Sequence, residues 1–153
     1  METNFNFKSQ RATTIEQSER MIALGIKKET ADMTHHYLHS TDSYELKDIE
    51  FSRIMHLQEL VNKKPVLGKS GDDLYAKDIP AWGLHRLIEM MPLDVIPEGG
   101  FDNCFTLIKN YPKGYSVEYD GFSYYHKENI YDTIIEGIEH LIKEGYFNKE
   151  YLV

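Results

Sequence analysis

The stretch that decides the fold runs from residue 103 to residue 126 and reads NCFTLIKNYPKGYSVEYDGFSYYH. Alternation of apolar and polar positions within it is typical of half-buried strands. We predict strands over residues 103–111, 115–119 and 122–126. A turn with proline second and glycine fourth joins the first two, and the dipeptide Asp120-Gly121 is a strong two-residue hairpin signal. These signals predict a three-stranded antiparallel β-meander with one apolar face.

The segment that follows predicts the cover for that face. Asn129 suits a helix N-cap, and Gly145 supplies a residue that ends helices. Between them an apolar stripe recurs at helical spacing, made of Tyr131, Ile134, Ile135, Ile138, Leu141 and Ile142. A sheet with one apolar face must bury it, so we expect the helix over residues 129–144 to pack on the meander. The fold class is therefore α+β.

Two further helices are predicted upstream. Thr13 and Glu16 form a capping box for a helix to residue 24, which Gly25 ends. The second helix opens at DIPAW, residues 78–82, with proline in its first turn, and Pro92 stops it.

The segments around these helices are less regular. Residues 27–43 read as a polar connector, and residues 44–62 as a loose third helix. We therefore expect two to three upstream helices, a polar tail over residues 1–12, and a single α+β domain over residues 13–153.

The bulk composition limits the classes of partner. The chain of 153 residues has 25 acidic and 17 basic side chains, a formal net charge of −8. An acidic surface repels phosphate groups, so nucleic acid and anionic membranes are not expected partners, whereas a basic protein would be attracted. The alternative is that the charge only keeps the chain soluble and monomeric. With one cysteine, Cys104, no internal disulfide forms, and its place at the start of an apolar strand predicts a buried, inert thiol. No signal peptide and no run of 18 apolar residues are seen, so we expect a cytoplasmic location.

One histidine cluster is a candidate metal site. His35, His36 and His39 lie close together in the sequence, with Asp32 three residues before the first of them. If this segment were helical, residues 35 and 39 would share a face, as two imidazole ligands of one zinc ion require. The alternative is that the histidines are solvated residues of a polar connector.

Aromatic residues are the candidate partner-binding groups. Six of the eleven tyrosines lie between residues 111 and 131, and a tyrosine-bearing sheet face suits protein recognition. We single out Tyr124 and Tyr125 on the third predicted strand, and Trp82, which sits off the centre of its predicted helical stripe. The alternative reading is that the tyrosines are ordinary strand residues and that Trp82 belongs to the core.

Three segments carry a family resemblance: TTIEQSERMIALGI at residues 13–26 with TADM at 30–33, DIPAWGLHRLIEMMP at residues 78–92, and the strand–hairpin–helix ending. Together they resemble a family of small uncharacterised proteins of gut Bacteroides-type bacteria and their phages. The resemblance implies a mobile-element or accessory setting, with no catalytic residue to transfer.

These observations predict a non-enzymatic accessory protein that binds another protein and needs no cofactor. The alternative is a small metal-binding protein or metal-dependent enzyme that uses Asp32, His35, His36 and His39, with zinc as its metal.

Overall fold

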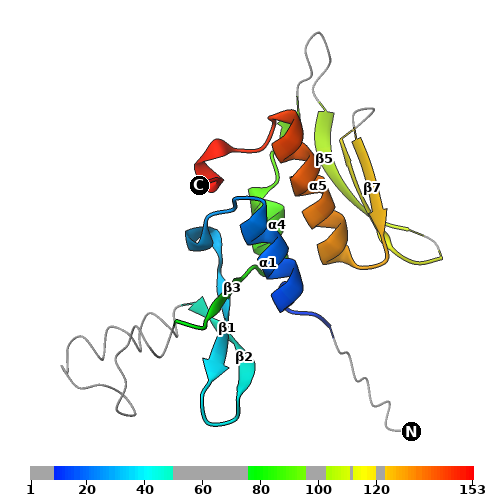
Figure 1. Ribbon diagram of the computed structural model, residues 1–153. Coiled ribbons are helices and arrows are strands. Elements are labelled where there is room, and N and C mark those ends of the chain that lie inside the picture. The colour runs from blue at the N-terminus through cyan, green and yellow to red at the C-terminus, as the bar shows by residue number, and fades with distance from the viewer. Residues whose placement is uncertain (1–8, 50–75, 96–102, 111, 120–122) are drawn as a thin grey trace, which may run out of the picture.

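The computed structural model describes residues 9–49, 76–95, 103–110, 112–119 and 123–153, and for Asn103 and residues 123–125 it describes the backbone alone. This part of the chain is mixed helix and sheet, with two antiparallel sheets around three helices (Figure 1). The helices are α1 (Ile15–Ala23), α4 (Leu84–Met90) and α5 (Ile130–Glu144).

The C-terminal sheet contains the three predicted strands and one more. Its order is β4-β5-β6-β7, all antiparallel, so β4 extends the predicted meander to four strands. The three strands were therefore predicted correctly, but the sheet to which they belong has four strands and not three. β4 pairs over two residues only, which is too short to show alternation in a sequence. The strands are β4 (Asp94–Val95), β5 (Asn103–Lys109), β6 (Tyr115–Tyr119) and β7 (Ser123–Lys127).

The helix α5 covers this sheet as predicted. Asn129 caps it by accepting from the backbone N–H groups of Tyr131 and Asp132. At the other end Gly145 has φ of 81°, and the N–H groups of residues 145 and 146 donate to the carbonyls of Ile142 and Leu141. This pair of bonds satisfies carbonyls that the end of a helix otherwise leaves without partners.

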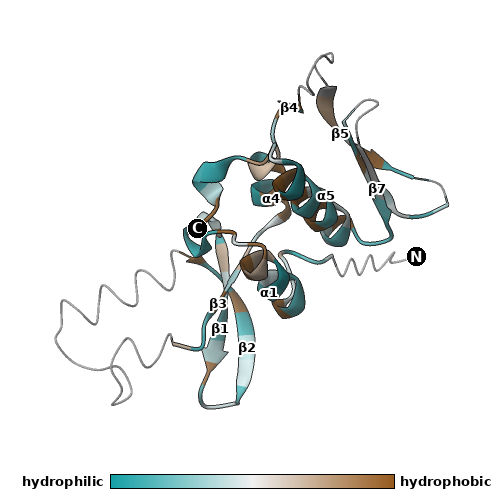
Figure 2. Cartoon of the chain, turned by 45° about the horizontal axis from the view of Figure 1, so that its top comes forward, coloured by the Kyte–Doolittle hydropathy of each residue, from teal (hydrophilic) through white to brown (hydrophobic). Residues whose placement is uncertain are grey.

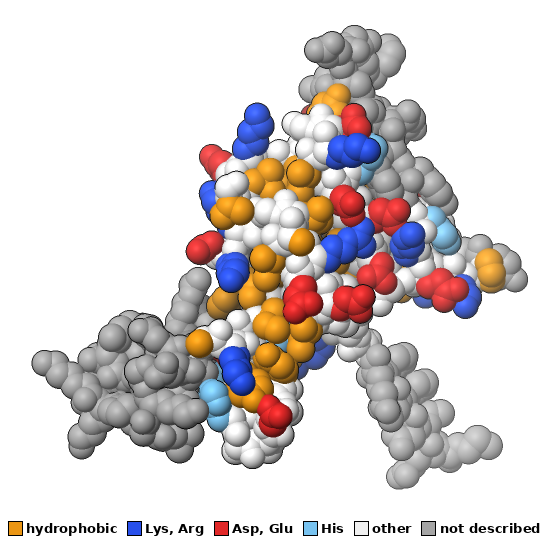
Figure 3. Space-filling model, in the orientation of Figure 1, with side chains coloured by type: hydrophobic (Ala, Val, Ile, Leu, Met, Phe, Trp, Pro, Cys, Tyr) orange, Lys and Arg blue, Asp and Glu red, His pale blue; other side chains and the backbone are white. Residues whose placement is uncertain are grey.

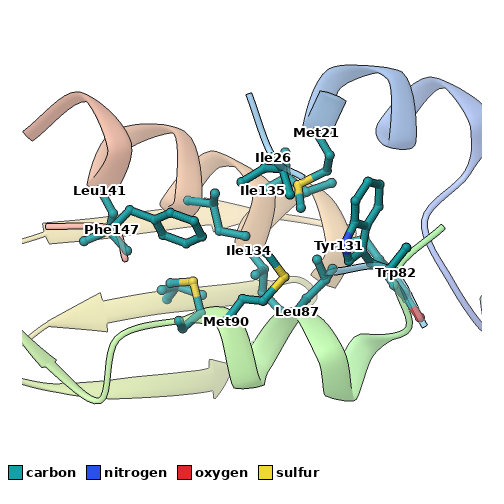
Figure 4. Close-up of a cluster of buried hydrophobic side chains, with 14 of the residues drawn as sticks. Met21, Ile26, Trp82, Leu87, Met90, Tyr131, Ile134, Ile135, Leu141 and Phe147 are labelled. Atoms are coloured by element: carbon teal, nitrogen blue, oxygen red, sulfur yellow. The ribbon is translucent and has the colours of Figure 1, made fainter. Parts of the chain in front are cut away.

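The main core lies where α5 meets the sheet on one side and α1 and α4 on the other (Figure 4). Ile134, Ile138 and Leu141 are fully buried along α5. Side chains of this kind stabilise a fold by about 1.5–3 kcal/mol each when they leave water. Met21, Trp82 and Leu87 come from the other elements to the same cluster, so the cluster joins segments distant in the sequence.

The helix α1 begins one residue later than predicted. Thr14, not Thr13, is the N-cap, and the reciprocal partner is Gln17 rather than Glu16. Thr13 is instead fully buried, with its hydroxyl 2.7 Å from that of Ser18. The end of α1 is as predicted, because Gly25 has φ of 84°.

The second sheet was not predicted. It has the order β2-β1-β3 and comprises β1 (Met33–Leu38), β2 (Ser43–Asp48) and β3 (Ile79–Ala81). The connector predicted over residues 27–43 therefore holds a strand, preceded by the 3₁₀ turn Lys28–Thr30, and the predicted helix over 44–62 is wrong for residues 44–48. The remainder of that segment lies outside the described residues. The helix predicted from residue 78 begins only at Leu84, because residues 79–81 pair with β1.

Burial within β1 and β2 explains why their alternation was hard to recognise. Met33, Thr34 and Tyr37 are buried in β1, so adjacent residues are covered on both faces. In β2, by contrast, no residue is buried. The β1–β2 hairpin reaches away from the helices and is largely hydrophilic along β2 (Figure 2).

The N-terminal boundary also needs a correction. Residues 10–12 belong to the fold and not to a tail: Ala12 is buried and forms a β-bridge with Gly83. The side chain of Gln10 accepts from Asn129 at 2.9 Å and donates to Gln17 at 2.7 Å, so it links the N-termini of α1 and α5. At the other end, Ile26 pairs with Leu152, just after the 3₁₀ turn Lys149–Tyr151.

Candidate functional site

The strand β1 separates the residues of the predicted metal site. Successive side chains of a strand point to opposite faces, so the shared helical face that the zinc hypothesis needs does not form. His35 places Nε2 2.8 Å from the carbonyl oxygen of Thr13. His36 places Nδ1 3.0 Å from both carboxylate oxygens of Asp78, and His39 is exposed after the strand. These contacts tie the first two histidines to different parts of the chain.

Asp32 serves the fold in another way. Its Oδ1 accepts from the backbone N–H of Gly83 at 2.7 Å, where α4 begins. A Cβ added to Gly83 would lie 2.8 Å from Oδ2, so any larger residue here would have to displace the Asp32 carboxylate from this contact. Burial raises the pKa of the Tyr131 hydroxyl, and the charge of Asp32 adds to that increase. Among the residues that the structure describes, no three His, Cys, Asp or Glu side chains are placed to hold a metal ion.

The pair His36–Asp78 is a feature that the sequence reading missed. The side chains are 18% and 11% exposed, and Asp78 also accepts from the backbone N–H of Tyr37 at 2.9 Å. Lys77 lies 4.2 Å from the centre of the Tyr37 ring. Asp78 therefore fixes the start of β3 to β1, and no spacing rule connects residues 42 positions apart.

Trp82 offers no surface to a partner. It is fully buried, and its Nε1 donates to the hydroxyl of Thr30 at 2.9 Å. The prediction that Trp82 is an interface anchor is therefore wrong, and its alternative, a core residue, is what the structure has. Placing the residue inside a helix caused the error, because it precedes α4.

The other two predicted partner-binding residues lie on β7. Tyr124 is opposite Glu118 in the register, and Tyr125 is opposite Val117. Their side chains lie outside what the structure describes, so their role in binding stays a prediction. What the structure does give is the position of their strand, at the edge of the four-stranded sheet.

Sheet edges expose backbone N–H and C=O groups to other chains, and proteins usually protect them. Three of the four edge strands here carry such protection. β3 is three residues long and contains Pro80, which has no N–H to offer. β2 carries charged side chains at Glu45, Lys47 and Asp48. β4 has two residues and pairs with β5 only at residues 103 and 104, so that edge is protected in part.

The fourth edge, β7, lacks these devices. It is five residues long, contains no proline or glycine, and pairs on one side with β6 over its whole length. Its one charged side chain, Lys127, forms an ion pair at 3.0 Å with Glu136 of α5. Within the described part of the chain no segment pairs with the outer side of β7.

Rigid packing supports this edge from one side. Val117 and Tyr119 of β6 are buried under α5, and the Tyr119 hydroxyl donates to the carbonyl of Pro92 at 2.8 Å. Burial raises the pKa of this hydroxyl, and the charge of Asp94 raises it further. As far as the structure describes the chain, β7 is thus unpaired on its outer side and is held on its inner side by a well-packed β6.

For two residues of the C-terminal sheet, Cys104 and Ser116, the observed burial differs from the sequence prediction. Cys104 is exposed, so the prediction of a buried thiol is wrong: the inward positions of β5 are Phe105 and Leu107. Ser116 is fully buried although its neighbours alternate as expected, because its hydroxyl accepts from the side-chain amide of Asn110.

Comparison with known proteins adds no identification: no family model, curated protein or solved structure matches the chain. The resemblance to small proteins of gut bacteria and their phages therefore stays a prediction. No helix in the described part is long and apolar enough to cross a membrane.

Proposed function

We propose that this chain is a non-enzymatic protein-binding module that adds an extended segment of a partner protein to β7. The observation that carries the proposal is that β7 is a five-residue edge strand without proline or clustered charge, whereas β2 carries several charges, β3 contains a proline and β4 is only two residues long. In strand addition, backbone hydrogen bonds supply affinity and alternate side chains supply selectivity. An accessory role in a mobile-element setting is consistent with such a module.

Amide hydrogen exchange, followed residue by residue by NMR, tests this proposal. The probe is a labelled heptapeptide, Thr-Val-Thr-Val-Thr-Val-Thr, which favours an extended conformation. At saturation, the outward N–H groups of residues 123–127 should exchange roughly tenfold more slowly than in the free protein. The amides of β2, the other long edge, are the internal control and should not change. Slower exchange in β2, with no effect in β7, would contradict the proposal.

Proline substitutions provide a matched pair of variants. Adjacent residues of an antiparallel strand direct their N–H groups to opposite sides, so residues 124 and 125 differ in which side they serve. One of Tyr124→Pro and Tyr125→Pro should therefore lower stability by removing a bond to β6. The other should keep the melting temperature and lose the peptide-dependent protection. Strand addition would be refuted if the variant that lacks the outward N–H stays folded and still binds the peptide with unchanged affinity.

A further inference from the structure

Charged side chains surround β7, and on the face of the molecule drawn in Figure 3 acidic and basic groups lie close together. The described residues of 112–119 and 123–137, which hold β6, β7 and the first half of α5, contain four carboxylates and two lysines. Both lysines are already in ion pairs, Lys113 with Glu128 at 2.8 Å and Lys127 with Glu136 at 3.0 Å. These two cations are therefore balanced within the chain.

Among the described residues, no cation is in contact with the remaining two carboxylates, Glu118 and Asp132. Asp132 accepts from the neutral amide of Gln17 at 2.6 Å, and Glu118 lies on β6 next to β7 in the sheet. His126 is counted as neutral here, as every histidine is in the formal charge of the whole chain. The four carboxylates less the two lysines leave a local charge of −2, and the whole chain carries −8.

We propose that the strand added to β7 is a basic one, with Lys or Arg at alternate positions. This inference rests on the proposed function and names its partner class. Complementary charge steers encounter and selects among partners, even where single exposed ion pairs add little affinity. A second copy of this chain is disfavoured as the occupant, since a two-fold pairing of β7 with itself brings the same excess of carboxylates together from both sides.

Three peptides of one length test the inference by fluorescence polarisation. They are Thr-Val-Lys-Val-Lys-Val-Thr, its glutamate counterpart and its glutamine counterpart. At about 20 mM salt the lysine peptide should bind about fivefold more tightly than the glutamine peptide and more tightly still than the glutamate peptide, and at about 500 mM salt the three affinities should converge.

Variants locate the effect. Glu118→Gln with Glu128→Gln should reduce the preference for lysine about threefold or more, since exposed charges act over roughly a Debye length. The matched control, Glu45→Gln with Glu150→Gln, removes the same charge from β2 and from the C-terminal segment and should leave the preference unchanged.

The outcomes separate the two proposals. If all three peptides protect β7 amides with equal affinity, strand addition stands and the basic preference fails. If none of them protects β7, the proposed function itself fails. A dimer in analytical ultracentrifugation whose β7 amides are protected without any peptide would overturn the assignment to a basic partner.

Discussion

The hydroxyl of Thr13 gives the sharpest test of how α1 is held. It accepts from the backbone N–H of Trp82 at 3.0 Å and lies 2.7 Å from the hydroxyl of Ser18, and all three residues are fully buried. Thr13→Val keeps the shape of the side chain and removes the hydroxyl. It should therefore leave a buried N–H without an acceptor while the packing is almost unchanged.

The expected loss follows from that geometry. An unsatisfied buried donor costs about 1–3 kcal/mol, so we expect Thr13→Val to lower the free energy of unfolding by about 2 kcal/mol. For a chain of this size, that corresponds to a melting temperature lower by about 4–8 °C. Thr13→Ser retains the hydroxyl and loses one methyl group, for about 1 kcal/mol. Thr14→Ala removes the N-cap of α1, also for about 1 kcal/mol.

Urea unfolding followed by circular dichroism measures all three variants. The order of stability should be wild type first, then Thr13→Ser and Thr14→Ala together, then Thr13→Val. Two results would refute the reasoning. One is Thr13→Val within about 0.5 kcal/mol of wild type, the usual range of surface substitutions. The other is Thr13→Ser as destabilised as Thr13→Val, which would assign the effect to the methyl group.

Tyr119, two glycines with positive φ and the histidines in and just after β1 can each be tested in the same way. Because burial raises the pKa of Tyr119, the folded state holds this proton more tightly than the unfolded state. The contribution of Tyr119 to the free energy of unfolding should therefore be constant below about pH 10 and decrease as the pH rises above it. Urea midpoints measured from pH 8 to pH 11 should show this decrease, and it should be smaller in Tyr119→Phe. The same pH dependence in both proteins would contradict the assignment to Tyr119. Gly145→Ala should cost about 1 kcal/mol, since φ is 81° and nothing lies within 4 Å of an added Cβ. Gly114→Ala, where the Cβ would lie 2.8 Å from a ring atom and from a carbonyl oxygen, should cost more in the same thermal melts, and equal costs would contradict the crowding. Finally, added zinc should shift the melting temperature of wild type and of His35→Ala with His39→Ala equally; stoichiometric zinc in the wild type, lost in the variant, would restore the metal hypothesis.

The C-terminal half was predictable because its signals are local. Each of these signals can be recognised from a few neighbouring residues. In the structure Asn129 is the N-cap of α5, the apolar stripe is its buried face, and Gly145 ends it with a positive φ. The alternation in β6 likewise placed Val117 and Tyr119 inward. At such positions propensity, capping and hydrophobic period agree, and the sequence then specifies the structure.

The N-terminal sheet was missed because its signals are not local. β1 is covered on both faces, so Met33 and Thr34 are both buried and no clean alternation appears. Pro80 reads as a helix start, yet it lies on an edge strand, where a missing N–H has no cost. The one-residue error at α1 has a similar origin, since Thr13 and Thr14 are equally good caps until a buried partner distinguishes them.

For the candidate site too, local features could be predicted from the sequence and long-range pairing could not. Sequence patterns identified the strand that carries Tyr124 and Tyr125, but they could not show that it lies at an open edge, because strand order depends on long-range pairing. The helix assumed for the histidine cluster was wrong, because residues 33–38 form β1 and His36 lies against Asp78; whether the chain binds zinc stays a prediction.

The contact between the segment after α1 and the C-terminal segment has a consequence for biosynthesis. Lys27 donates from its side chain to the carbonyl of Glu150, 123 residues later in the chain. At translation rates of about 5–20 residues per second, the first of these segments waits about 6–25 seconds for its partner. During that interval the apolar residues Met21 and Ile26 have no α5 to cover them. Nascent chains stalled before residue 130 should therefore bind holdase chaperones, and chains extended by a linker, so that residue 153 has left the ribosome, should not.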